Sequence, residues 1–209
     1  MKGKQTMVDV LRELPVPLFR TADAVKLASD DNMFLYRASR SGYLKKICNG
    51  VYWNLLFHPE PPKVEKVACF ARQPSYITCE WALNYHGLLL QVPQVCTAVT
   101  LHPGTGKRNR VRYEGYVIEY SRLKETLYLP EEILVLDGIL MATAEKALLD
   151  AAYLRHEIPF ADELEKDLLD VGRLTRLTLK YPASVQRMVR NFIEGLEGED
   201  HESRSSLLE

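Results

Sequence analysis

The segment His58–Pro62 limits what this chain can fold into more than any other, because it holds three prolines in four positions. Proline has no amide hydrogen to donate and does not continue a helix, so this segment is expected to be extended and semi-rigid. It predicts a boundary between an N-terminal domain over residues 1–57 and a larger domain over residues 63–195. The acidic stretch 196–209 has few apolar residues and is predicted to be a flexible tail.

The composition is that of a globular protein with little overall charge. Of the 209 residues, 46% are hydrophobic and 26% are charged, which excludes an intrinsically disordered chain. The net charge of -1 excludes a polycation, so a nucleic-acid-binding surface would have to come from local charge segregation. Residues 1–57 show such segregation, with nine Lys or Arg against five Asp or Glu.

The cysteines give no sign of a metal site or of disulfides. No two of them form a C-x-x-C pair, and no histidine stands at zinc-finger spacing from Cys48, Cys69, Cys79 or Cys96. We therefore expect free thiols, no metal and no cofactor, in a cytoplasmic protein. The sequence has no apolar run of membrane length and no signal-peptide pattern, so no membrane association is expected.

The N-terminal domain is predicted to hold three helices and a hairpin. Apolar spacing indicates a helix over residues 4–14, and Thr21 is a good N-cap for a second helix, with Asp23 in its first turn. A third helix is predicted over residues 31–41, where Gly42 can adopt the left-handed conformation that ends a helix. Asn49-Gly50 lies between β-branched and aromatic residues and indicates a hairpin turn. Three helices followed by a hairpin predict a winged helix-turn-helix.

In that fold the third helix enters the DNA major groove and the hairpin lies along the phosphates. Leu35 and Ala38 are expected to face the core, and arginines on another side of the helix could pair with guanine edges. The predicted DNA-binding residues are Tyr36, Arg37, Arg40, Ser41, Lys45, Lys46 and Asn49. A structural cap or a dimerisation module is the alternative interpretation, because basic residues are common on protein surfaces.

The second domain mixes helical and strand patterns, so the chain is predicted to be α+β, with a mixed α/β domain that ends in a helical segment. Helices are predicted over residues 63–73, 80–86, 143–154, 159–170, 172–179 and 183–194. Strands are predicted over residues 75–78, 95–101 and 111–120, and a strand or hairpin over residues 133–140.

A basic loop joins two of these strands. Its Gly-rich start superficially resembles a phosphate-binding loop, but Leu101 and Arg108 stand where that motif requires glycine and Ser or Thr, so we reject nucleotide binding. The same region holds four cations: Lys107, Arg108, Arg110 and Arg112. They form either a solvated hairpin tip or a second patch that contacts nucleic acid or a protein partner.

Three residues of the second domain invite a catalytic interpretation: His86, Glu145 and Asp150. Glu145 and Asp150 lie about 140° apart around one helix, so they would not share a metal or a proton. Lys146 and Asp150 are predicted to form an ordinary surface ion pair, and His86 to cap a helix end. No catalytic residue is predicted, and the protein is not expected to be an enzyme.

Three segments, in order, resemble the AbiEi-type antitoxin family. They are Ser39–Tyr52 (SRSGYLKKICNGVY), Tyr76–Leu88 (YITCEWALNYHGL) and Ala142–Asp150 (ATAEKALLD), and the likeness covers roughly residues 20–155. The resemblance implies a type IV antitoxin that represses its own operon by binding inverted repeats in double-stranded DNA through a winged helix-turn-helix. It also implies a partner, a nucleotidyltransferase-like toxin opposed by the second domain.

Two other functions remain open at this point. The first is a protein-interaction module that neutralises a toxin without binding DNA. The second is a nucleic-acid-processing enzyme that uses the loop over residues 104–112.

Overall fold

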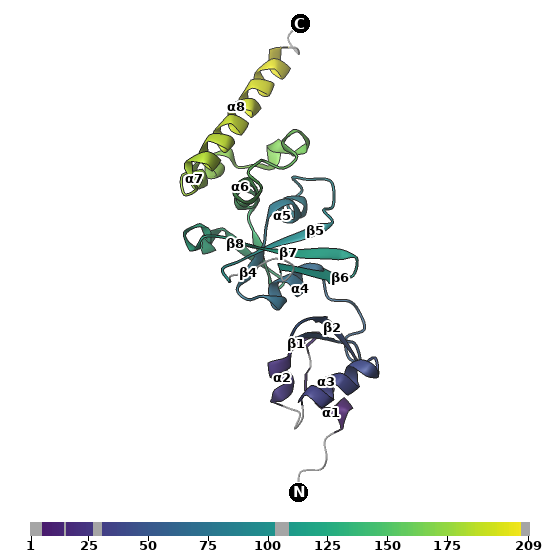
Figure 1. Cartoon of the computed structure of the whole chain (residues 1–209). Helices are drawn as coiled ribbons and strands as arrows, with labels where there is room; N and C mark the ends of the chain where they lie inside the picture. The colour runs from purple at the N-terminus through teal and green to yellow at the C-terminus, as the bar shows by residue number, and fades with distance from the viewer. Residues whose placement is uncertain (1–5, 15, 27–30, 103–108, 206–209) are drawn as a thin grey trace.

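The computed structural model describes residues 6–14, 16–26, 31–102 and 109–205. Within them the chain has the predicted α+β fold, with eight α-helices, a three-stranded antiparallel sheet and a six-stranded mixed sheet. Two hydrophobic cores are present, one within the N-terminal module up to residue 57 and one centred on the second unit, which also takes in Leu18 and Trp53 of the module. Figure 1 shows the N-terminal module at one end of the molecule and the C-terminal helix at the other.

The N-terminal module alternates short helices with the strands of one small sheet. Its elements, in chain order, are α1 (Met7–Arg12), β1 (Leu18–Arg20), α2 (Thr21–Val25), α3 (Asp31–Arg40), β2 (Leu44–Cys48) and β3 (Val51–Asn54). The sheet order is β1-β3-β2, and all neighbouring strands are antiparallel. The helices and the hairpin were predicted, whereas β1 was not.

One face of this sheet packs on the helices. Phe19 and Tyr52 are paired across β1 and β3, and their rings stack with centroids 5.8 Å apart. Leu35 and Ala38 of α3 are buried in the same core, as predicted. Burying each large apolar side chain contributes about 1.5–3 kcal/mol, so this core fixes which side of α3 faces outward.

The end of α3 is set by its backbone. Gly42 has φ +74°, its amide donates to the Ser39 carbonyl, and the Tyr43 amide donates to the Ala38 carbonyl. These two bonds are a Schellman motif, which satisfies carbonyls that would otherwise lack partners at the helix end. Gly42 therefore fixes the direction in which β2 leaves the helix, as the sequence predicted.

Replacing Gly42 with alanine is expected to lower the free energy of unfolding by about 1 kcal/mol, because an L-residue is strained in the left-handed region. A Cβ at this position would meet nothing within 4 Å, so the cost comes from the backbone alone. Urea unfolding followed by circular dichroism measures the change. Gly195→Ala is the matched control, because a Cβ there also meets nothing within 4 Å and its φ is not in the left-handed region. A loss of equal size in both variants would contradict the assignment.

The second unit is built on a six-stranded sheet with the order β6-β7-β5-β4-β9-β8. The pairs β4–β9 and β5–β7 are parallel and the others are antiparallel. Its strands, in chain order, are β4 (Ser75–Ile77), β5 (Val95–Thr100), β6 (Arg110–Tyr113), β7 (Tyr116–Arg122), β8 (Ile133–Leu136) and β9 (Ile139–Ala142).

Helices cover both faces of this sheet. α4 (Val64–Ala71) packs on the face nearer the N-terminal module, whereas α5 (Cys79–Tyr85) and α6 (Ala144–Arg155) lie on the other (Figure 1). α7 (Val171–Thr178) and α8 (Ala183–Ser205) pack against α6 as an outer layer. No helix among the described residues is long and apolar enough to cross a membrane.

Three sequence predictions for this unit were wrong. Residues 111–120 are not one strand, because Glu114 and Gly115 both have positive φ and form the turn between β6 and β7. The segment 159–170 contains two short 3-10 turns instead of a helix, and the Glu165 amide donates to the Leu88 carbonyl of another loop. The backbone of the acidic tail continues α8 to Ser205, where an end near 194 was predicted.

Candidate nucleic-acid interface

The outward side of α3 carries the side chains that were predicted to read DNA. Tyr36 is 60% exposed, and Arg37, Arg40 and Ser41 are exposed as well. At 100° per residue, Tyr36, Arg37 and Arg40 lie within about one third of the helix circumference, opposite the buried Leu35 and Ala38. The fold therefore brings these residues together on one side of the helix.

The two arginines of α3 have no acidic partner among the described residues. The Nη1 atom of Arg40 is 3.5 Å from the Tyr36 hydroxyl, and no hydrogen bond or ion pair joins the side chain of Arg37 to a described residue. Met33, 43% exposed, lies on the same side of the helix and was not among the predicted residues. An exposed apolar side chain at this position can contact the methyl group of thymine. The pattern of charged residues did not indicate such a contact.

The hairpin β2–β3 presents its two lysines to different surroundings. Lys46 pairs with Tyr52 on the face that packs on the helices, and no hydrogen bond or ion pair joins its amine to a described residue. Lys45 pairs with Trp53 on the opposite face. Its amine forms an ion pair with Glu114 of the β6–β7 turn and lies 5.6 Å from the centroid of the Trp53 ring. The structure thus places Lys45 at the junction of the two units, apart from the arginines of α3.

The turn of the hairpin is held at its base. Asn49 is exposed, Gly50 has φ +75°, and the Gly50 carbonyl accepts a hydrogen bond of 3.0 Å from the Thr21 amide at the start of α2. A backbone bond at this point limits the freedom of the hairpin tip. The side chain of Asn49 is therefore presented from a fixed position next to α2.

Two of the four cations of the second predicted basic patch lie within the described residues. Lys107 and Arg108 lie outside the described residues. Arg110 and Arg112 are exposed on β6 two residues apart, and so share a face of the strand. The Nε atom of Arg110 donates to Glu119 at 2.6 Å, whereas no hydrogen bond or ion pair joins the side chain of Arg112 to a described residue.

Two residues that were not predicted to matter join the N-terminal module to the second unit. Arg20 donates to the Phe70 carbonyl of α4, and its guanidinium lies 5.0 Å from the centroid of the Phe70 ring. Trp53 is 4% exposed and belongs to the core of the second unit, and its indole donates to the His58 carbonyl at 2.7 Å. Neither follows a pattern that could have been found from the sequence, because both contacts depend on the packing of the two units.

The three residues that invited a catalytic interpretation lie apart from this surface. His86 is hydrogen-bonded through Nε2 to the Ala142 carbonyl at 2.8 Å, next to the end of α5. Glu145 accepts from the Asp170 amide at 3.1 Å, and no described residue is a partner of both Glu145 and Asp150. Among the described residues, no group of three or more His, Cys, Asp or Glu side chains could hold a metal ion.

The prediction of a surface pair between Lys146 and Asp150 was wrong. Both side chains are 0% exposed, and the ammonium lies 2.9 Å from the Asp150 carboxylate and 2.9 Å from the Leu127 carbonyl. Asp150 also accepts hydrogen bonds from three hydroxyl groups, those of Tyr76, Thr78 and Tyr181. The pair is buried because the sheet and the helices α5, α7 and α8 all pack on α6. The part of α6 that carries Lys146 and Asp150 therefore has no side that faces solvent.

The tyrosines of this cluster are held neutral. Burial, and secondly the charge of Asp150, raise the pKa of Tyr76 and of Tyr181 well above the ordinary range. Each phenol therefore remains a hydrogen-bond donor to the carboxylate. A cluster that is closed to solvent and internally satisfied acts as structure and offers no surface to a substrate.

Comparison with protein-family models finds no match for this chain, and comparison with curated proteins finds none either. The likeness to AbiEi-type antitoxins therefore rests on the three sequence segments and stays a prediction.

Proposed function

We propose that this protein is a DNA-binding transcriptional regulator with an N-terminal winged helix-turn-helix, and that it acts as the antitoxin and autorepressor of a toxin–antitoxin operon. It would bind inverted repeats of double-stranded DNA in the cytoplasm and act by binding, without catalysis. The described order of elements supports the fold part of this proposal. A helix, a strand, two helices and a hairpin form one small module with a three-stranded antiparallel sheet.

The observation that carries the proposal is the outward side of α3. Arg37 and Arg40 are exposed, and no described acidic residue pairs with them, while the opposite side of the helix is buried. Each arginine can form two hydrogen bonds to a guanine edge, and each such pair discriminates against a wrong base by about 1–3 kcal/mol. In the proposed complex Tyr36, Arg37 and Arg40 contact bases, and Ser41, Lys46 and Asn49 contact the backbone.

The antitoxin part of the proposal involves a protein partner, a nucleotidyltransferase-like toxin, and is supported by the family likeness and one surface. Leu90, Val92 and Leu168 are more than half exposed, at 77%, 60% and 56%. They lie on two segments that the bond between the Glu165 amide and the Leu88 carbonyl holds together. Large exposed apolar side chains on neighbouring segments are typical of protein interaction sites.

The direct test is binding of the whole protein to a labelled duplex from the region upstream of its own gene, followed by fluorescence anisotropy at several salt concentrations. Arg40→Ala is expected to weaken binding to the upstream duplex about 5- to 150-fold, the equivalent of 1–3 kcal/mol, and to weaken binding to a shuffled duplex much less. Arg187→Ala, which removes an exposed arginine of α8 far from α3, is the matched control and should leave the preference unchanged (Figure 1).

An Arg40→Ala variant that is folded and binds the upstream duplex as tightly as the unmodified protein would overturn the assignment of α3 as the helix that reads DNA.

A second function, a protein-interaction module that does not bind DNA, is favoured by the exposed apolar surface alone. A flat titration with the upstream duplex at every salt concentration would support it over the regulator.

A further inference from the structure

A pocket of about 330 Å³ lies where the N-terminal module meets the second unit. It is lined by both lysines of β2 and by residues of β6, β7 and the turn between them. Three basic side chains and one acidic side chain border it: Lys45, Lys46, Arg112 and Glu114. The pocket is therefore cationic, although the whole chain has a net charge of -1.

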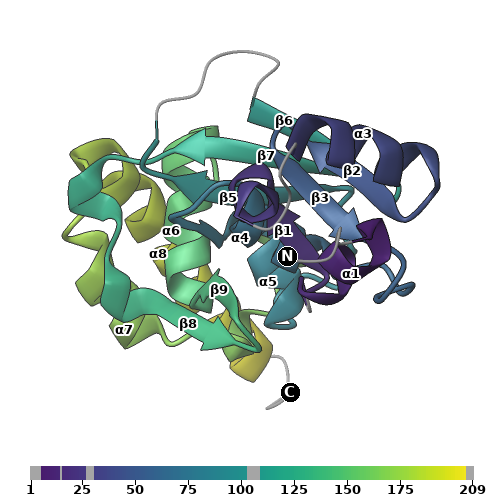
Figure 2. The ribbon, with the colours of Figure 1, turned by 90° about the horizontal axis from the view of Figure 1, so that it is seen from below.

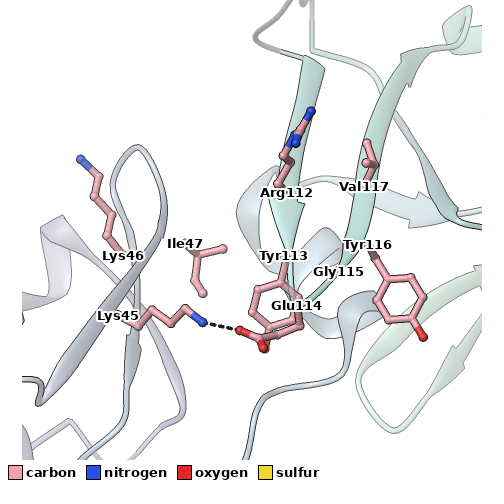
Figure 3. A pocket seen from close by; sticks show the side chains of 9 residues that line it. All are labelled: Lys45, Lys46, Ile47, Arg112, Tyr113, Glu114, Gly115, Tyr116 and Val117. Carbon is pink, nitrogen blue, oxygen red and sulfur yellow. Dashed lines mark hydrogen bonds and ion pairs between the residues drawn. The ribbon is translucent and has the colours of Figure 1, made fainter.

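The single carboxylate at this pocket is already engaged. Glu114 forms an ion pair with Lys45, and Figure 3 shows these two side chains pointing toward one another across the junction. Lys46 and Arg112 extend from their strands away from Glu114 (Figure 3). No hydrogen bond or ion pair joins either side chain to a described residue, so the pocket is bordered by two cations, one from each unit, that have no acidic partner among the described residues.

The pocket continues the surface of α3. β2 contacts both α3 and β6, so the three elements follow one another from the N-terminal module into the second unit. Figures 1 and 2 both show α3, β2 and β6 on the same side of the molecule. A duplex that lies along α3 and passes the hairpin would therefore meet β6 next.

We propose that the second unit takes part in DNA binding, with Arg112 holding a backbone phosphate of the duplex that α3 reads. This inference rests on the proposed function and adds a contact outside the N-terminal module. The ion pair between Lys45 and Glu114 joins β2 to the turn after β6, so Arg112 lies next to the hairpin that is expected to follow the DNA backbone. Arg110, the other described arginine of this strand, is neutralised by Glu119 and contributes less.

A phosphate contact of this kind contributes affinity without reading sequence. Neutralising one phosphate releases condensed counterions and changes the slope of log affinity against log salt by about 0.9. Between roughly 50 and 200 mM salt, one phosphate contact accounts for about a threefold fall in affinity. A variant that lacks this contact should therefore lose about threefold less affinity over the same salt range. Arg112 should therefore affect every duplex alike, in contrast to Arg40.

The experiment compares Arg112→Ala, Arg112→Lys and Arg187→Ala in the full chain, with the upstream duplex and a shuffled duplex over a salt series. Arg112→Ala is expected to weaken binding to both duplexes by the same factor and to lower the salt slope by about 0.9. Arg112→Lys keeps the charge and should retain the slope. Arg187→Ala removes the same charge at a distance and should not change it.

The outcomes distinguish failure of the phosphate contact from failure of the regulator proposal. If Arg40→Ala weakens specific binding while Arg112→Ala behaves like Arg187→Ala, the phosphate contact is overturned and the regulator stands. If the unmodified protein shows no salt-dependent binding to either duplex, both are overturned. If Arg112→Ala loses preference for the upstream duplex over the shuffled one, Arg112 reads bases and the phosphate assignment is wrong.

Discussion

Replacing Lys146 with methionine is expected to lower the free energy of unfolding by about 3–5 kcal/mol, because it leaves the buried Asp150 carboxylate without its counterion. Methionine fills a similar volume, so the loss does not come from an empty cavity. The carboxylate keeps its three hydroxyl donors but loses the ammonium 2.9 Å away, and the Leu127 carbonyl loses the hydrogen bond that the same ammonium donates. Urea unfolding monitored by circular dichroism measures the change.

An exposed ion pair of the same chemistry provides the control. Lys180 contacts Glu131 at 2.7 Å with side chains 44% and 55% exposed, so Lys180→Met should cost no more than about 1 kcal/mol. The double variant Lys146→Met with Asp150→Asn should lose less than the two single losses added together, since the residues share one network. Strict additivity, or a Lys146→Met loss as small as that of Lys180→Met, would show that the pair is not a coupled buried unit.

Trp53→Ala is the second change with a large expected effect, about 3–5 kcal/mol, because a buried tryptophan is truncated to a methyl group. Trp53 is a residue of β3 that packs in the core of the second unit, together with Leu18 of β1. The change also removes the indole bond to the His58 carbonyl and the ring beneath Lys45. We expect the single unfolding transition to broaden or split, because the N-terminal module loses its main apolar contact with the second unit.

Denaturant unfolding followed by circular dichroism, together with hydrogen exchange of the β1–β3 amides, tests this expectation. Tyr36→Ala removes an aromatic side chain that is 60% exposed, and should change the free energy of unfolding by about 0.5 kcal/mol or less. If Trp53→Ala and Tyr36→Ala unfold alike, the two units do not depend on Trp53 for their attachment.

The elements that the sequence predicted well have local causes. Gly42 ends α3 through its own backbone conformation, and Asp137-Gly138 makes the β8–β9 turn because both residues have positive φ. Thr143 caps α6 by accepting from the Lys146 amide. The outward position of Arg37 and Arg40 follows in the same way from helical spacing, once Leu35 and Ala38 are assigned to the core.

The features that were missed depend on contacts between distant segments. β1 has three residues, and it is a strand only because β3 lies beside it. Lys146 and Asp150 have the spacing of an ordinary surface pair, and only the packing of helices around α6 buries them. The role of Lys45 likewise depends on Glu114, which lies 69 residues later in the chain.

The small sheet of the N-terminal module is covered on both faces, by its own helices on one and by the second unit on the other. A polypeptide cut after Phe57 would leave Leu18 and Trp53 open to water, along with the stem of Lys45. Such a fragment is expected to aggregate or to unfold, so loss of activity on truncation would report on solubility and not on which half of the molecule recognises its partner.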